Sequence, residues 1–251
     1  MDKLIYTAFN TLNNIYDNRS VRAQNMSNVN VPGYRRDLGT KAVGSAFMSA
    51  ENTFQARALA IRDDSNIFES DPGTLSQTGS EMDVAIRGNG YFMVKGPGAP
   101  SLTRRGDLSV NKDGFLVNGS RQVFLDKNQT PIQIGPYRAI QFADNGDVFV
   151  EPLGSEPGTK NLVATIGLTS GAGEELKKFP DGEIRAKNGG LPLADQKPTL
   201  VQKHIELSNV NITEELVNTI EDQRAYEVNI KLITSAKEAD EAGASLMRMP
   251  N

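Results

Sequence analysis

The sequence contains no cysteine and no tryptophan, a single histidine, and few aromatic residues, which make up 6% of its 251 residues. The absence of cysteine excludes disulfides and thiolate nucleophiles and disfavours a typical zinc site. A serine–histidine–aspartate triad would need the lone His204, which alternates with Ile205 in a strand pattern, and the sequence has no G-x-S-x-G turn. We therefore expect no catalytic residues.

Nucleotide and metal motifs are also missing. Gly88-Asn89-Gly90 lacks the third glycine of a dinucleotide fingerprint, and there is no P-loop. Asp144–Asp147 resembles the start of a calcium loop, but Ser155 stands where such a loop needs glutamate. We expect no cofactor and no metal.

Long apolar runs are absent as well. Leu162–Leu168 is the longest and is interrupted by Thr165 and Gly167, far short of the roughly 20 residues that span a membrane. Met1–Asn10 carries Asp2 and lacks the continuous apolar segment of a signal peptide. We expect no transmembrane segment, and a protein that is cytosolic or exported without a cleaved signal. The net charge of −4 does not suggest a nucleic-acid partner.

What the sequence does have is a short tag that occurs near both ends. It reads SNVNV at Ser27–Val31 and SNVNI at Ser208–Ile212. The first tag closes a predicted helix over Met1–Asn30, because Pro32 excludes the helical conformation from the residue before it, and Pro32-Gly33 fits a type II turn. The second opens a predicted helix over Ile212–Met249, with Asn211 as its N-cap. Both termini therefore meet the middle of the chain at the same polar tag.

Each predicted helix carries two apolar stripes. The N-terminal stripes are Ile5, Ala8, Leu12, Ile15, Met26 and Val29, and Leu4, Phe9, Tyr16 and Ala23. The C-terminal stripes are Leu216, Ile220, Tyr226, Ile230 and Ile233, and Leu232, Ala236, Ala239, Gly243 and Leu246. Such helices could pack in the core of their own domain, or they could form coiled coils with each other and with another subunit. Residues 1–38 are net basic and residues 212–251 net acidic, which favours pairing of the two ends.

The middle of the chain reads as an extended connector followed by short strands. Residues 34–77 have no clean period, although Ala42–Ala60 holds Phe47, Met48 and Phe54, and we expect a connector with a hairpin. Over Asp83–Leu207, short strand-like segments alternate with Gly/Asn/Asp turns, which predicts an antiparallel sandwich or barrel-like module. Gly88–Gly90 and Asn111–Gly114 are hairpin signals between such segments, and Asp144–Asp147 is a further turn signal. Within it, Glu174–Pro198 is rich in Gly, Lys and Pro and is predicted to be an exposed excursion.

Motifs near both ends and in the middle of the chain resemble those of the flagellar rod and hook axial proteins. Gln24–Tyr34, QNMSNVNVPGY, is similar to the signature N-N-x-A-N-x-x-T-P-G-Y/F, with Ser27 and Val31 in place of alanine and threonine. Met82–Val94, MDVAIRGNGYFMV, is similar to D-x-A-I-x-G-x-G-F-F-x-V, and Thr103–Gly106 to T-R-x-G. The C-terminal segment resembles S-N-V-N…E-x-V-x-M-I…Q-R-A-Y-E-x-N-x-K, with matches at Glu215, Val217, Ile220, Gln223, Arg224, Ala225, Tyr226, Glu227, Asn229 and Lys231.

The resemblance implies an elongated α+β protein. Paired, coiled-coil-like terminal helices would line an axial tube and an inserted antiparallel β domain would face outward. The implied domains are an N-terminal helix over 1–33, a connector over 34–77, a β domain over 78–207 and a C-terminal helix over 208–251. Such terminal helices are expected to order on assembly, since a long helix without its partner leaves apolar surface in water.

The implied function is that of a non-enzymatic rod subunit in the flagellar basal body, exported through the flagellar type III apparatus. Its partners would be proximal and distal rod subunits and copies of itself. Length and the opening MDKLIYTAF fit proximal rod members best, with distal rod and hook members as alternatives. The residues assigned to assembly are Asn25, Asn28, Asn30, Pro32, Gly33, Tyr34, Gln223, Arg224, Tyr226, Glu227, Asn229 and Ile230. Of these, Gln223, Arg224, Tyr226 and Asn229 could instead form a solvated helix face.

Two further alternatives come from other classes of protein. A cell-wall hydrolase would need two acidic residues in one cleft. An assembly scaffold would use its helices to hold a partner transiently. Muralytic activity would identify the hydrolase, and absence from the finished structure would identify the scaffold.

Overall fold

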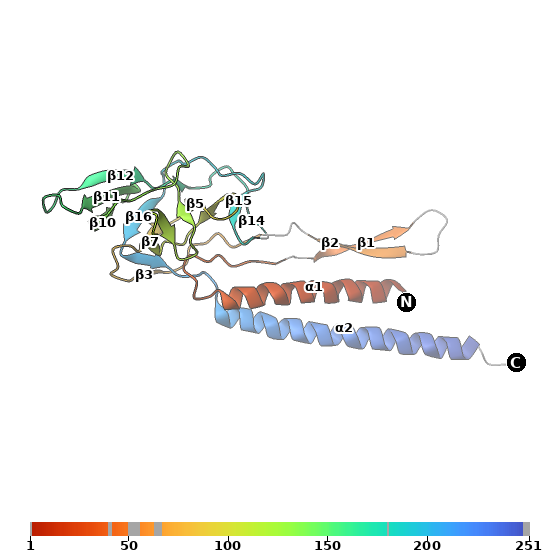
Figure 1. Cartoon of the computed structure of the whole chain (residues 1–251). Coiled ribbons are helices and arrows are strands. Elements are labelled where there is room, and N and C mark those ends of the chain that lie inside the picture. Colours follow the sequence, from red (N-terminus) through yellow and green to blue (C-terminus); the bar gives the residue numbers. More distant parts are fainter. Residues whose placement is uncertain (1, 40–41, 50–55, 63–66, 180, 248–251) are drawn as a thin grey trace. The chain divides into compact units, whose positions relative to one another are not determined.

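A computed structural model describes residues 2–39, 42–49, 56–62, 67–179 and 181–247 (Figure 1). The chain divides into two compact units. The helical unit comprises residues 1–27, 37–67 and 211–251, and the β unit comprises residues 28–36 and 68–210. The described residues form two helices and mostly antiparallel sheets, so the α+β class is confirmed.

The helical unit contains α1 (Asp2–Ser27), α2 (Ile212–Met247) and the hairpin β1 (Ala42–Ser49) and β2 (Ala56–Arg62). The helices lie side by side (Figure 1), and α1 also contacts the hairpin. They run antiparallel, because Arg22 bonds to Asp222 whereas Asn25, further along α1, bonds to Glu215, which precedes Asp222 in α2. The paired strands β1 and β2 confirm the hairpin that was expected in the connector. Phe54 lies outside the described residues.

Local signals at the ends of the helices are mostly confirmed. Asn211 Oδ1 accepts hydrogen bonds from the backbone N–H groups of Thr213 and Glu214, at 3.0 and 3.3 Å, and so caps α2. The expected continuation of α1 to Asn30 is wrong. The helix ends at Ser27, and the chain then turns, with Val31 N donating to the Asn28 carbonyl at 3.0 Å.

The β unit is built from short strands. They are β3 (Leu75–Gln77), β4 (Val84–Arg87), β5 (Tyr91–Lys95), β6 (Pro100–Thr103), β7 (Leu108–Val110), β8 (Leu116–Asn118), β9 (Val123–Phe124), β10 (Tyr137–Phe142), β11 (Asp147–Pro152), β12 (Asn161–Thr165), β13 (Leu168–Thr169), β14 (Leu176–Lys178), β15 (Ile184–Ala186), β16 (Thr199–Gln202) and β17 (His204–Glu206).

These strands form four sheets. The largest runs in the order β14-β15-β6-β5-β9-β8-β7, with β13 also paired to β5. Strands β10-β11-β12 form a second sheet, and β16-β4 and β17-β3 are two-stranded. No sheet in the described part of the chain closes into a barrel. The late strands β16 and β17 therefore return to pair with the earliest strands of the unit.

The sequence signals for hairpins are confirmed at two turns but not at a third. Asn111–Gly114 joins the paired strands β7 and β8, and Asp144–Asp147 joins β10 to β11. Gly88-Asn89-Gly90 also turns the chain, but β4 pairs with β16 while β5 pairs with β6, β9 and β13. This turn sends the chain into a different sheet, so a local glycine signal does not identify the strand partners.

The expectation that Glu174–Pro198 is an exposed excursion is wrong. Strands β14 and β15 lie in this segment and extend the largest sheet, with Ile184 opposite Leu102. Its buried polar side chains have partners. The Lys178 ammonium donates to the Arg35 carbonyl at 3.2 Å, and the Arg185 guanidinium donates to the carbonyls of Ala99 and Pro100. Polar composition therefore does not mean exposure here.

The core of the β unit is aliphatic with two packed phenylalanines. Phe92 and Phe124 meet edge to face, with ring centroids 5.4 Å apart. Buried strand residues such as Ile86, Leu116 and Leu168 pack in the same cluster. This core supports the polar cluster described next.

Candidate assembly surface and supporting polar clusters

Three charged side chains are buried together in the β unit. Arg35, Arg104 and Glu206 are each at most 2% exposed. The Glu206 carboxylate lies 2.6 Å from Arg104 Nη2 and 2.7 Å from Arg35 Nη2. Glu206 also accepts the backbone N–H of Gly73 at 2.8 Å. We call Arg35, Arg104 and Glu206 the arginine–glutamate cluster.

Burial shifts the pKa of one group in this cluster and of one group beside it. It lowers the pKa of the Arg104 guanidinium below its ordinary value, and the charge of Glu206 opposes that shift. Burial also raises the pKa of the nearby Tyr91 phenol above 10.0, and Arg35 and Arg104 partly oppose it. The Arg104 guanidinium further donates to the Gly90 carbonyl at 2.7 Å. The cluster is therefore dry and closely tied to the backbone.

The cluster brings together the first tag, the T-R-x-G segment and the approach to the second tag. The Pro32-Gly33 turn is confirmed as the predicted type, with Gly33 at φ +66° and Tyr34 N donating to the Val31 carbonyl at 3.2 Å. Gly33 N donates to the Glu206 carbonyl at 2.8 Å. A β-carbon at Gly33 would lie 2.4 Å from the Arg104 carbonyl carbon. Only glycine fits this approach.

Asn209, in the second tag, ties together other segments of the β unit. Its Oδ1 accepts the backbone N–H of Arg36 at 2.7 Å. Its Nδ2 donates to the carbonyls of Glu69 and Asp71, at 3.1 and 3.0 Å. Because one amide side chain satisfies three backbone groups, Asn209 holds two chain segments at one point.

Asn25 has a similar role inside the helical unit. It is 1% exposed. Its Oδ1 accepts the backbone N–H of Asp37 at 2.9 Å, and its Nδ2 donates to the Asp37 carbonyl at 2.9 Å and to Glu215 Oε1 at 3.1 Å. Arg22 adds ion pairs to Asp222 at 2.7 Å and to Glu215 at 3.6 Å. These bonds support the expected pairing of a basic N-terminal segment with an acidic C-terminal one.

The side of α2 that faces α1 is mostly polar or small, and it coincides fully with neither predicted stripe. The buried and half-buried positions of α2 recur mostly every three or four residues, and Ile233 is the one large apolar side chain among them. They are Glu215, Asn218, Thr219, Asp222, Ala225, Asn229, Ile233, Ala236 and Gly243. The contacts of Glu215 and Asp222 with α1 identify this side.

The large apolar side chains of α2 are instead exposed. They are 39–56% exposed between residues 216 and 232, and they are Leu216, Val217, Ile220, Tyr226, Val228, Ile230 and Leu232. On α1 the first stripe is mostly covered, whereas Phe9 and Tyr16 of the second are 56% and 76% exposed. The Leu4 side chain lies outside the described residues. We call the exposed apolar residues of α2 the outer apolar surface.

The predicted assembly residues lie in three separate places. Asn25 lies in the helical unit, and the other residues of the first motif, Asn28, Asn30, Pro32, Gly33 and Tyr34, lie in the turn of the β unit. Gln223, Arg224, Tyr226, Glu227 and Ile230 are exposed on α2. Gln223 donates to Glu227 at 3.1 Å, and Asn229 donates to the Ala225 carbonyl of its own helix at 2.8 Å.

Sequence reasoning missed the roles of Arg35, Arg104, Glu206, Asn209 and Arg22. Arg104 lies in the T-R-x-G segment and Asn209 in the second tag, so these motifs were the signal that could have identified both residues. Glu206 lies in a strand pattern whose other residues suggested only a sheet. Its buried partners come from distant segments and are not recognisable locally.

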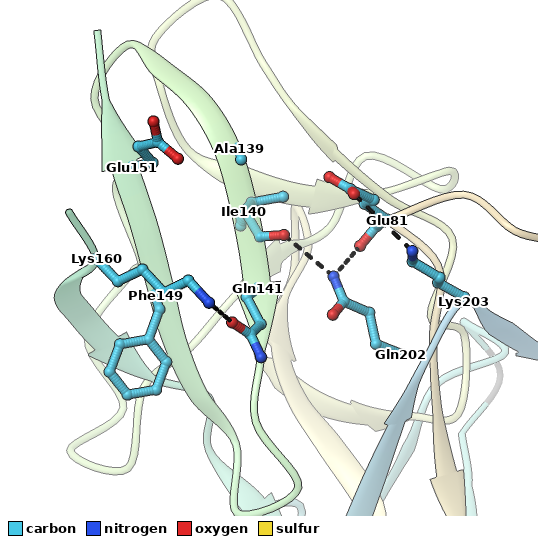
Figure 2. Close-up of a pocket in the computed structure, with 9 residues that line it drawn as sticks. All are labelled: Glu81, Ala139, Ile140, Gln141, Phe149, Glu151, Lys160, Gln202 and Lys203. Atoms are coloured by element: carbon cyan, nitrogen blue, oxygen red, sulfur yellow. Dashed lines mark hydrogen bonds and ion pairs between the residues drawn. The ribbon is translucent and has the colours of Figure 1, made fainter. Parts of the chain in front are cut away.

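A surface pocket of about 280 Å³ in the β unit lies beside β10, β11 and β16 (Figure 2). Its charged and amide side chains bond mostly to one another or to the backbone. Lys160 donates to Gln141 at 2.6 Å, and Gln202 donates to the carbonyls of Glu81 and Ile140. Most polar side chains of the lining are therefore already engaged in hydrogen bonds within the chain.

In the described ranges, the acidic side chains and the histidine form no group of three or more that could hold a metal ion. Neither helix, as far as it is described, is long and apolar enough to cross a membrane.

Comparison with known proteins identifies the family. Residues 201–246 match the model of the flagellar basal body rod FlgEFG protein C-terminal region, and residues 85–150 match that of the flagellar hook protein FlgE/F/G D1 domain. The flagellar basal-body rod protein FlgG of Buchnera aphidicola subsp. Baizongia pistaciae is 32% identical over 243 residues, covering 87% of this chain and 90% of the relative.

Rod proteins named FlgF match over almost their whole length. That of Salmonella typhimurium is 26% identical over 256 residues, covering 99% of this chain and 100% of the relative. That of Escherichia coli K12 is 27% identical over 251 residues, covering 97% and 96%. The chain therefore belongs to the family of flagellar basal-body rod proteins, which are structural and non-enzymatic subunits of the rod.

Proposed function

We propose that this chain is a FlgF-type subunit of the proximal rod that polymerises through its terminal helices. The observation that carries the proposal is the outer apolar surface of α2. A helix that faces α1 with mostly polar and small residues and keeps its large apolar residues exposed is suited to further neighbours. The FlgF relatives of Salmonella typhimurium and Escherichia coli, which align with 97–99% of this chain, support the FlgF-type assignment.

The energetics support assembly through this surface. Fully burying a leucine, valine or isoleucine stabilises by about 1.5–3 kcal/mol. Covering each half-exposed residue would therefore contribute roughly 1 kcal/mol. Several such residues on each of many subunits can offset the entropy of ordering the helices. Head-to-tail repetition of one such contact generates a helical tube.

In this proposal the domains have distinct tasks. Residues 1–33 and 208–251 form a coiled-coil helical core, residues 34–77 are a connector, and residues 78–207 are an outward β domain of sandwich type. Gln223, Arg224, Tyr226, Glu227, Asn229 and Ile230 pack or hydrogen-bond at subunit contacts, together with Asn25. Asn28, Asn30, Pro32, Gly33 and Tyr34 form the helix stop and turn that lead into the outer domain.

The partners follow from this assignment. They are other proximal and distal rod subunits, copies of the chain itself, and the flagellar type III export apparatus. The chain reaches the basal body without a cleaved signal peptide.

The test is assembly of helix variants. Tyr226→Asp and Ile220→Asp place a charge among apolar residues that a neighbouring subunit would cover, and both should block rod assembly while the β unit stays folded. Ser235→Asp, at an exposed polar position of the same helix, is the control and should assemble normally. Normal rods from both apolar variants would overturn the proposal.

A further inference from the structure

A line of asparagines on α1 faces the arm of the helical unit, which we define as residues 37–39, 42–49 and 56–62. At 100° per residue, Asn14, Asn18 and Asn25 lie within about 40° of one another around the helix. Asn14 and Asn25 are buried and Asn18 is half-buried, although asparagine usually lies at the surface. Buried asparagines need hydrogen-bond partners, and because these three share one face of α1, we expect a partner that runs along that face.

Asn25 shows what that partner is. Its amide accepts the N–H and donates to the C=O of the same residue, Asp37, both at 2.9 Å. An asparagine side chain carries one acceptor and one donor group in the geometry of a peptide, so it can pair with an extended backbone as a neighbouring strand does. The bonds go to the backbone, so they do not depend on the side chains of the arm.

Asn18 meets the arm two residues later. Gly39 has φ +70°, and a β-carbon on it would lie 2.7 Å from Asn18 Oδ1. The arm therefore approaches the Asn18 side chain closely, and the positive φ at this point favours glycine. Asn25 contacts Asp37, and Asn18, which is earlier in α1, lies beside Gly39, which is later in the arm. The arm and the helix therefore run in opposite directions.

Asn14 is the next position of this line. It is 8% exposed, and its Oδ1 has no hydrogen-bond partner in the described part of the chain. Buried amide oxygens are rarely left without a donor. Beyond Gly39 the arm enters β1, and both strands of the hairpin contact α1.

We propose that Asn14, Asn18 and Asn25 form an asparagine ladder that seats the arm on α1. In this ladder the buried Asn14 oxygen, which has no donor among the described residues, gains a backbone N–H of the arm in solution. They are positioning residues, and the arm is ordered by α1 through them. The ladder lies within a single chain, so it does not depend on the assembly proposed above.

Hydrogen exchange followed by mass spectrometry on the full-length chain tests the ladder. Asn25→Ala should speed exchange of the amides in residues 37–49 about five- to tenfold, as expected for lost hydrogen bonds, and leave residues 84–94 of the β unit unchanged. Asn13→Ala is the matched control, because Asn13 is the exposed neighbour of Asn14 on the same helix.

Asn14→Leu separates the ladder from simple burial. If the Asn14 oxygen has no partner in solution, leucine removes an unsatisfied polar group and the arm exchanges at the same rate or more slowly. The ladder predicts faster exchange over residues 42–49, and the opposite result overturns the role of Asn14.

Amide hydrogen exchange is measured on the free chain and on the assembled chain. The variants are compared in whichever of these two states protects the amides of α1 from exchange. An arm that stays protected while α1 exchanges freely would overturn the whole ladder.

Discussion

Arg104 and Glu206 are 102 residues apart in the sequence, and Arg104 Nε donates to Glu206 Oε2 at 2.7 Å inside the β unit. Neither side chain reaches water, and Arg35 shares the same carboxylate. A buried ion pair of this kind adds little net stability over an apolar pair, but removing one partner leaves a buried charge uncompensated.

Removal of either partner should strongly destabilise the β unit. We expect Glu206→Gln and Arg104→Leu each to lower the free energy of unfolding by about 3–5 kcal/mol, measured by urea denaturation. The control is Arg105→Leu. Arg105 is the next residue and pairs with Asp107 at 2.7 Å near the surface, so its loss should cost about 1 kcal/mol or less. Equal costs for Arg104 and Arg105 would contradict the prediction.

The Gly33 turn should tolerate no side chain. Gly33→Ala combines a positive φ with a contact of 2.4 Å to the Arg104 backbone, so we expect a loss of about 3 kcal/mol or more. Gly88→Ala has a similar φ of +77° but nothing within 4 Å of the new β-carbon, and should cost about 1 kcal/mol. Thermal denaturation compares the two variants, and similar losses would show that packing against Arg104 has no role.

Alkaline pH should weaken the β unit through Tyr91. Its raised pKa means that the phenol stays protonated in the folded unit after the unfolded chain has begun to lose the proton, near pH 10.0. The stability it contributes is complete below that pH and is lost as pH rises through the folded pKa. Urea denaturation from about pH 8 to about pH 11 should show this decline, and Tyr91→Phe should flatten it. An unchanged slope in Tyr91→Phe would assign the decline to other groups.

Limited proteolysis should show whether the terminal helices become protected only on assembly or are already protected in the free chain. In the free chain at low concentration, we expect rapid cleavage near Met1–Tyr34 and Ile212–Asn251, and survival of a core near Asp83–Leu207. The physical reason is the outer apolar surface, which stays uncovered until assembly. Mass spectrometry identifies the fragments. Ends that resist cleavage as well as the core does would reopen the scaffold alternative.

Features set by neighbouring residues could be predicted from the sequence. Asn211 capped α2, Pro32-Gly33 formed its turn, and Asn111–Gly114 joined a hairpin, because each depends on a few consecutive residues. The helices themselves were evident from their periodicity, apart from the last residues of α1.

Features set by distant residues could not. Glu206 gathers Arg35 and Arg104 from two remote segments, and β14 and β15 hold buried Lys178 and Arg185 whose partners lie elsewhere. The side of α2 that meets α1 escaped prediction for a related reason. Apolar periodicity predicts which side of a helix becomes buried. On α2, the contact with α1 does not bury most of the large apolar residues.

The pairing of β16 with β4 and of β17 with β3 has a consequence for a chain that emerges N-terminus first, whether from a ribosome or from a narrow channel. Until residues 199–206 are free, two early strands lack their partners and the charges of Arg35 and Arg104 have no carboxylate to neutralise them. The β unit can therefore close only after about four-fifths of the chain has emerged. Its last strands decide when folding can finish, and a chain still in passage is kept open by its own topology.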